Sequence, residues 1–95
     1  MIRINNVDMS RKSFAKTLRA ASTDIQSQIL SAATSLTNEP IPARLRFEKL
    51  SCYRNPSIYT IHITRNHSHK LSFEIHGTTA ILRKVGTHKE IDRAP

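Results

Sequence analysis

Residues 59–76 read YTIHITRNHSHKLSFEIH, and this stretch decides the fold. Apolar side chains take every second position in both of its halves: Tyr59, Ile61 and Ile63, then Leu71, Phe73 and Ile75. Such alternation predicts two half-buried antiparallel strands, with one face on the core and the other face open. The polar residues 65–69 are expected to form the turn that joins the two strands.

The flanking sequence extends this sheet on both sides. Apolar and charged residues also alternate over residues 44–48, which predicts a short strand or an extended arm. Gly77-Thr78 predicts a tight hairpin, and residues 79–85 are expected to form a last strand whose facing is ambiguous. Gly86 is expected to end that strand. The C-terminal half is therefore expected to be an antiparallel meander.

The N-terminal half has the pattern of a scaffold. Residues 1–7 are short and contain β-branched side chains, which predicts a first strand. A helix capped by Asp8 or Ser10 is expected to follow and to run to about Ala21. Such a helix would cover one face of the sheet.

A second helix is expected after an interruption at Ser22–Thr23. Thr23 and Gln26 have the spacing of a capping box, which satisfies the free N–H groups of a helix start. The apolar stripe of this helix consists of Ile25, Ile29, Ala33 and Leu36. The helix is expected to end before Pro40, because the residue that precedes a proline avoids the helical region.

These elements predict an α+β fold in a single domain over residues 1–95. An N-terminal strand and two helices pack on one face of a small antiparallel sheet. A chain of 95 residues buries roughly 60–65% of the surface that its unfolded form exposes, so it builds one modest core. The other sheet face is expected to display polar residues as a platform for RNA: Thr60, His62, Ser72, Glu74 and His76.

The distribution of charge points to a polyanionic partner. The formal net charge is +8, and the basic residues are concentrated in residues 44–95, which also contain all five histidines. A basic, histidine-rich half favours nucleic acid as the partner. A membrane surface is disfavoured, because no basic amphipathic helix with a large apolar face is present.

Cysteine usage and hydropathy bear on the compartment. The single cysteine, Cys52, has no second cysteine with which to form a disulfide or a zinc knuckle. The first ten residues have no apolar run, so no secretory signal is expected. A cytoplasmic protein without a membrane anchor is therefore expected.

Three stretches resemble the RelE/ParE toxin superfamily. Residues 47–53, FEKLSCY, resemble its "L-x-G-Y" segment, with Cys52 where glycine is usual. Residues 59–63 resemble the strand that carries a basic residue or histidine into the active site. Residues 82–91, LRKVGTHKEI, resemble the closing strand and the ending of the YafQ-like branch. The resemblance covers about residues 10–92.

The resemblance implies the toxin of a type II toxin–antitoxin system. Known members of this kind are mostly mRNA interferases: endoribonucleases that cut messenger RNA, often on the ribosome, and thereby inhibit translation. The implied partners are RNA and a small acidic antitoxin protein. Neither a cofactor nor a metal is implied.

The reaction itself defines which residue types are needed. A base takes the proton of the 2′-hydroxyl, a cation stabilises the charge on the phosphorane, and an acid protonates the leaving 5′ oxygen. By resemblance, the catalytic residues are His62, Lys84 and His88. Arg83 precedes Lys84 by one place and is a second candidate for the cation. The residues expected to bind RNA are Arg44, Arg46, Lys49, Arg65, His67 and Arg83.

Three alternatives remain open from the sequence. The ParE-like branch shares the fold but poisons DNA gyrase, and a toxin that has lost activity would be a noncatalytic RNA-binding module. The set of His62, Lys84 and His88 favours the nuclease, because a pure binder does not need it. A zinc site made of His62, His67 and His69 is a weaker hypothesis, since no cysteine cluster or carboxylate spacing supports it.

Overall fold

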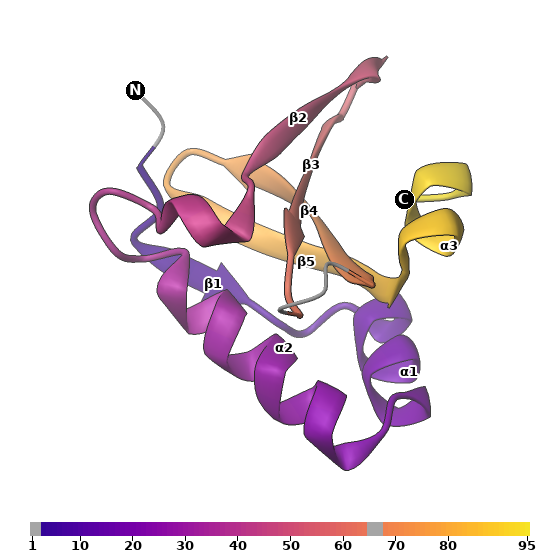
Figure 1. Cartoon of the computed structure of the whole chain (residues 1–95). Coiled ribbons are helices and arrows are strands. Elements are labelled where there is room, and N and C mark those ends of the chain that lie inside the picture. The colour runs from indigo at the N-terminus through magenta and orange to yellow at the C-terminus, as the bar shows by residue number, and fades with distance from the viewer. Residues whose placement is uncertain (1–2, 65–67) are drawn as a thin grey trace.

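The computed structural model describes residues 3–64 and 68–95, and Figure 1 shows the course of the chain. The elements follow in the order β1 (Asn6–Asp8), α1 (Lys12–Ala20), α2 (Thr23–Ser35), the 3₁₀ turn η1 (Ala43–Leu45), β2 (Glu48–Arg54), β3 (Ser57–His62), β4 (His69–His76), β5 (Thr79–Thr87) and α3 (His88–Arg93). Residues 65–67 of the expected turn lie outside the described residues. No helix in the described part of the chain is long and apolar enough to cross a membrane.

The sheet has five strands in the order β1-β5-β4-β3-β2 (Figure 1). Strands β2 to β5 form the expected antiparallel meander. The expectation of a wholly antiparallel sheet is wrong at one edge, because β1 pairs with β5 in parallel. After β1 the two helices carry the chain across to the far edge of the sheet, and the meander then leads back to the side of β1.

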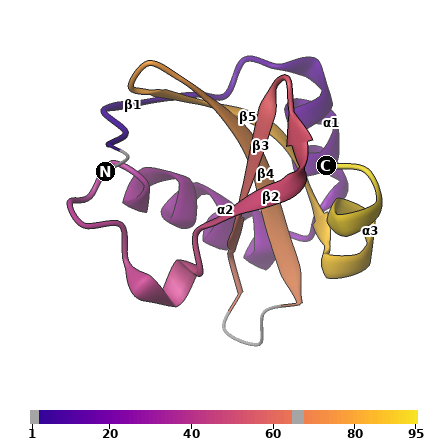
Figure 2. The ribbon, with the colours of Figure 1, turned by 90° about the horizontal axis from the view of Figure 1, so that it is seen from above.

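The main core lies between the sheet and the pair α1 and α2, which cover the same face (Figures 1 and 2). The two helices contribute the buried side chains of Phe14, Ile29, Ala33 and Leu36. The strands contribute Ile61, Leu71, Phe73 and Leu82 to the same cluster. The α+β class and the alternation that predicted which side of β3 and β4 faces the core are confirmed.

The second face of the sheet is not the open platform that the alternation suggested. The side chains of Thr60, Ser72 and Glu74 are buried there. On that side a third helix, α3, packs against β4 and β5, the oxygen of Pro95 after this helix accepts from the Ser72 hydroxyl at 3.0 Å, and two arginines contact Glu74. Gly86 does not end the last strand, which continues to Thr87.

Helix α3 begins with a complete capping box. The Thr87 side chain accepts from the Glu90 N–H at 3.3 Å, and the Glu90 carboxylate accepts from the Thr87 N–H at 2.9 Å. A β-carbon added to Gly86 would lie 3.2 Å from the Glu90 carboxylate, so glycine leaves room for this box. The sequence Thr87-His88-Lys89-Glu90 has the spacing of a capping box and contained the signal for the missed helix.

The starts of the first two helices differ from the expectation by one position or more. Neither Asp8 nor Ser10 caps α1, whose N-cap is Arg11 without a side-chain cap. Instead, the Asp8 carboxylate accepts from the Ser10 N–H at 2.8 Å and thus forms a turn before the helix. The N-cap of α2 is Ser22, one residue before the expected Thr23.

A buried carboxylate connects three parts of the fold. The Glu74 side chain on β4 is only 7% exposed, and it accepts from the guanidinium groups of Arg11 before α1 and Arg83 on β5. Its other oxygen lies 2.8 Å from Nε2 of His76. Burial raises the pKa of Glu74, but the hydrogen bonds from His76, Arg11 and Arg83 outweigh it and lower the pKa to about 2.

Replacing this carboxylate is expected to destabilise the fold. Glu74→Gln should lower the free energy of unfolding at pH 7 by about 2–3 kcal/mol, because two arginines lose their charge partner while remaining partly hydrated. The folded pKa of about 2 lies below the ordinary value of 4.5, so this stabilisation is complete above about pH 4.5. It is lost as the pH falls through about 2. Urea unfolding followed by circular dichroism at several pH values measures both effects.

The matched control for this prediction is Glu48→Gln, the same substitution at an exposed position of β2. It should leave the free energy of unfolding at pH 7 within about 0.5 kcal/mol of the wild-type value. Equal stability of Glu74→Gln and wild type at pH 7 would contradict the importance of the cluster.

The cap of α3 is expected to control that helix locally. Thr87→Ala should cost about 1 kcal/mol, because one N–H group of the first turn loses its acceptor. Amide hydrogen exchange should become faster in α3, while the amides of β3 and β4 keep their protection. Ser22→Ala, which removes the N-cap of α2, is the control and should act on α2 instead. Faster exchange throughout the sheet in Thr87→Ala would contradict a local effect.

Candidate active site

The structure brings His62 and His88 together from distant parts of the sequence. His62 is the last residue of β3, and His88 is the first residue of α3. The centroids of the two imidazole rings are 5.4 Å apart, and the rings meet edge to face at 78°. His62 is 9% exposed, whereas the side chain of His88 is 48% exposed. The pair therefore consists of one buried imidazole on the sheet and one imidazole that solvent and ligands can reach.

A hollow of about 520 Å³ opens beside these histidines. Besides His62 and His88, its lining includes Arg46, Glu48, Tyr53, Lys70 and Asp92. The lining comes from the residue after η1, from β2, from the end of β3 and the start of β4, and from α3, so the hollow forms only when the sheet and the last helix are packed together. It presents proton-carrying groups, cations and carboxylates to one space.

Lys70, Asp92 and His88 form a chain of charged contacts along one side of the hollow. Lys70 Nζ donates to Asp92 Oδ1 at 2.9 Å, and His88 Nδ1 lies 2.8 Å from Asp92 Oδ2. The Lys70 side chain is only 5% exposed, so its ammonium depends on this partner. The hydrogen bond from Lys70 lowers the pKa of Asp92 despite the opposing effect of burial, and the charges of Lys70 and His88 lower it further.

Lys70 is thus a cation beside the two histidines that the sequence interpretation did not single out. It lies directly opposite His62 in the pairing of β3 with β4. The alternation could have identified Lys70, because Lys70, Ser72 and Glu74 occupy every second position of the strand and therefore point to the same side of the sheet.

The two cations that the sequence did single out on β5 make other contacts. Arg83 donates to Glu74 and, at 3.1 Å, to the oxygen of Pro95. Lys84 Nζ lies 3.4 Å from the oxygen of Ala94. Neither residue belongs to the lining of the hollow in the described part of the chain.

A second hollow of about 710 Å³ adjoins the first, and Arg46 and His62 line both. It lies between η1, the end of β3 and the side of α2 that carries Gln28 and Ser31. Arg46 has a left-handed backbone with φ of 50°, which is uncommon for a residue other than glycine. This backbone places Arg46 at the junction of the two hollows.

Of the remaining residues expected to bind RNA, the structure describes two, Arg44 and Lys49. Arg44 lines the second hollow, and Lys49 is exposed on β2 opposite Tyr59. Arg65 and His67 lie outside the described residues. The structure thus brings Arg44 and Arg46 to the two hollows and leaves Lys49 on the outer strand of the sheet.

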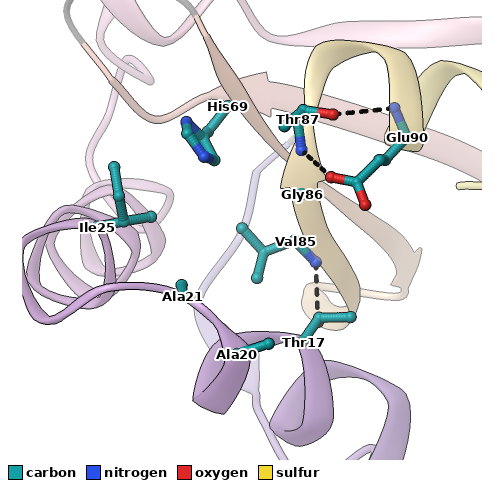
Figure 3. Close-up of a pocket in the computed structure, with 9 residues that line it drawn as sticks. All are labelled: Thr17, Ala20, Ala21, Ile25, His69, Val85, Gly86, Thr87 and Glu90. Carbon is teal, nitrogen blue, oxygen red and sulfur yellow. Dashed lines mark hydrogen bonds between the residues drawn. The ribbon is translucent and has the colours of Figure 1, made fainter.

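His69 lies in a different place from His62 and His88. It lines a smaller hollow of about 240 Å³. Figure 3 shows His69 facing the α1–α2 corner beside the end of β5. Apolar side chains from both sides, such as Ile25 and Val85, line this hollow, and the capping box of Thr87 and Glu90 forms its rim (Figure 3). Among the described residues, no group of three His, Cys, Asp or Glu side chains gathers as a metal site would require.

Two comparisons by sequence give no match. No family model matches the chain. No curated protein matches it either.

Comparison with solved structures gives clear likenesses. The chain is similar to one in the crystal structure of the RelB-RelE antitoxin-toxin complex from Methanococcus jannaschii, with a TM-score of 0.67 and 25% identity over 95% of this chain and 99% of that chain. It is also similar in fold to a chain of the archaeal RelE-RelB complex from Pyrococcus horikoshii OT3. There the TM-score is 0.63 and the identity 14%, over 92% of this chain and 96% of that chain.

These likenesses extend over nearly the whole of both chains. They confirm the resemblance to the RelE-like toxin superfamily that the sequence predicted, and the chain has the fold seen in these RelE-RelB structures.

Proposed function

We propose that this protein is the toxin of a toxin–antitoxin system and acts as a metal-independent endoribonuclease on messenger RNA. The observation that carries the proposal is the pair of His62 and His88, 5.4 Å apart, beside the buried ammonium of Lys70 in one hollow. Imidazoles suit proton transfer near neutral pH, and an ammonium suits a phosphate. The net charge of +8 supports a polyanionic substrate.

The reaction follows from these groups. One imidazole accepts the proton of the 2′-hydroxyl, whose oxygen then forms a bond to the adjacent phosphorus. The other imidazolium donates a proton to the 5′ oxygen as its bond to phosphorus breaks. Lys70 stabilises the charge that builds on the phosphorane. The products are a 2′,3′-cyclic phosphate and a free 5′-hydroxyl.

The two adjoining hollows supply the binding surface for a single RNA strand. Arg46 stands at their junction and Arg44 lines the larger one, so both can hold phosphates on either side of the cleaved bond. Lys49 extends this basic surface along β2. Contacts of this kind position the strand without reading its sequence, and they weaken as salt increases. Cleavage on the ribosome would add alignment from the A site.

A small acidic antitoxin is the proposed protein partner. The similar archaeal structures are complexes of RelE with RelB. A protein of net charge +8 has electrostatic complementarity to an acidic partner, and such binding is expected to weaken with salt. Translation inhibition in the cytoplasm would follow whenever the toxin is released from this partner.

The first test of the proposal is the cleavage reaction itself. The purified protein, with and without ribosomes, should cut RNA in excess EDTA and leave a 2′,3′-cyclic phosphate or 3′-phosphate. RNA with a 2′-deoxy group at the cleaved position should resist, because the nucleophile is missing. His62→Ala and His88→Ala should each lower the rate by about 10²–10⁴-fold.

Other outcomes of this test would favour other functions. Activity that disappears on chelation and returns with a divalent metal would contradict the mechanism. Growth arrest on expression without any RNA cleavage would favour a poison that acts by binding, such as one directed at DNA gyrase.

The second test compares two lysines. Lys70→Met should lower the cleavage rate by about 10²–10³-fold, because it removes the cation beside the histidines and keeps a side chain of similar length. Lys84→Met should change the rate by less than about threefold, since Lys84 contacts Ala94 instead of lining the hollow. Single-turnover cleavage at saturating RNA measures both variants. A larger loss of cleavage rate in Lys84→Met than in Lys70→Met would instead assign the stabilising cation to Lys84.

A further inference from the structure

Asp92 makes an unusual pair of contacts for a residue on a short surface helix. Its two carboxylate oxygens contact different groups of the hollow: Oδ1 accepts from Lys70 and Oδ2 lies 2.8 Å from Nδ1 of His88. His88 and Asp92 are four residues apart on α3, so they lie on the same side of that helix. One carboxylate thus connects the cation of the site to one of its imidazoles.

The contact with His88 is more than the fold requires. Lys70 needs an anionic partner because its side chain is 5% exposed, and Oδ1 alone provides it. The side chains of Asp92 and His88 are 46% and 48% exposed, so water could satisfy both without a direct contact. The second oxygen instead lies beside Nδ1 of His88. The other ring nitrogen, Nε2, is then the one available for proton transfer.

We propose that Asp92 is a positioning residue for RNA cleavage, which holds His88 with its proton on Nδ1 and leaves Nε2 to act as the base. This inference rests on the proposed function. A carboxylate oxygen at 2.8 Å from a neutral imidazole nitrogen requires a proton on that nitrogen, since two lone pairs would otherwise repel. The same arrangement of carboxylate and imidazole fixes the tautomer of catalytic histidines in serine hydrolases.

The 2′-hydroxyl proton moves to His88 Nε2, the 2′ oxygen bonds to phosphorus, and the bond from phosphorus to the 5′ oxygen breaks. Protonated His62 gives its proton to that 5′ oxygen. Asp92 remains a carboxylate throughout and stabilises the imidazolium of His88 as it forms. Exchange with water then restores both rings.

Asp92 is suited to this role over the pH range in which histidines titrate. The hydrogen bond from Lys70 keeps the pKa of Asp92 below its ordinary value, so the carboxylate stays charged well below neutral pH. Among the described residues, the titratable or charged groups that share the hollow with it are Arg46, Glu48, Cys52, Tyr53, His62, Lys70 and His88. The two imidazoles are the members of this set whose ordinary pKa lies near neutrality.

Asp92→Asn is the test, since it removes the charge and keeps the size of the side chain. The value of kcat should fall about 10- to 100-fold, a part of what a general base contributes, while KM for RNA stays within about twofold. The limb of the pH–rate profile on which the base loses its proton should shift to lower pH, because the imidazolium loses its anionic partner. Asp92→Glu should recover part of the rate.

A readout without RNA tests the same inference on the protein alone. Nitrogen-15 NMR of the histidine rings should show neutral His88 with its proton on Nδ1 in the wild type and a mixture of tautomers in Asp92→Asn. Thr87→Ala weakens α3 through its cap but keeps Asp92, so its folded form should retain the wild-type tautomer. Asp24→Asn, the same substitution at an exposed position of α2, should change neither the tautomer nor kcat.

The outcomes separate this inference from the proposed function. An inactive His88→Ala together with Asp92→Asn of wild-type rate and tautomer would overturn the role of Asp92 and leave the nuclease standing. Wild-type protein that cuts no RNA would overturn the proposed function, and the role of Asp92 in catalysis with it.

Discussion

The buried carboxylate of Glu74 is the constraint on which the rest of the fold depends. A charge that is 7% exposed on the middle of β4 must be compensated, and the compensation comes from Arg11 at the start of α1 and Arg83 on β5. One carboxylate therefore fixes where the first helix begins and how the last strand lies. Arg83 also donates to Pro95, so the segment after α3 is held by the same group of contacts.

Arg83 is also the unpaired residue at an irregularity in the sheet. The pairing of β4 with β5 shifts in register between Ser72 and Phe73, so that β5 has an extra residue at this point. A bulge of this kind changes which side chains face each side of a strand and increases its twist. Strand β5 then reaches Gly86 and Thr87 beside the start of β4, where α3 can begin over Lys70. The hollow with the two histidines is thus built by the end of a strand that Glu74 helps to place.

The sequence correctly predicted the elements that depend on local periodicity. It failed where packing between segments far apart in the chain determines the structure. Strands β3 and β4 could be predicted because Ile61 and Leu71 belong to regular alternations with one buried face. The assignment of Lys84 as the catalytic cation came from its distance to Gly86 and stays a prediction, and no local pattern reveals the bulge that separates β5 from simple alternation. Helix α3 was missed because Gly86 was interpreted as a breaker, although the capping box of Thr87 and Glu90 could have revealed the helix.

The two histidines belong to elements of unequal stability. His62 is on a strand between two neighbours in the sheet, whereas His88 begins a helix of six residues, too short to persist without its packing. Such a helix opens at a much smaller free-energy cost than the global unfolding of the sheet. The fraction of molecules with an assembled site is then set by the docking equilibrium of α3, and it can fall while the sheet remains fully folded. Loss of the site on heating would accordingly precede the melting of the protein, so the folded state and the competent state are two separate populations.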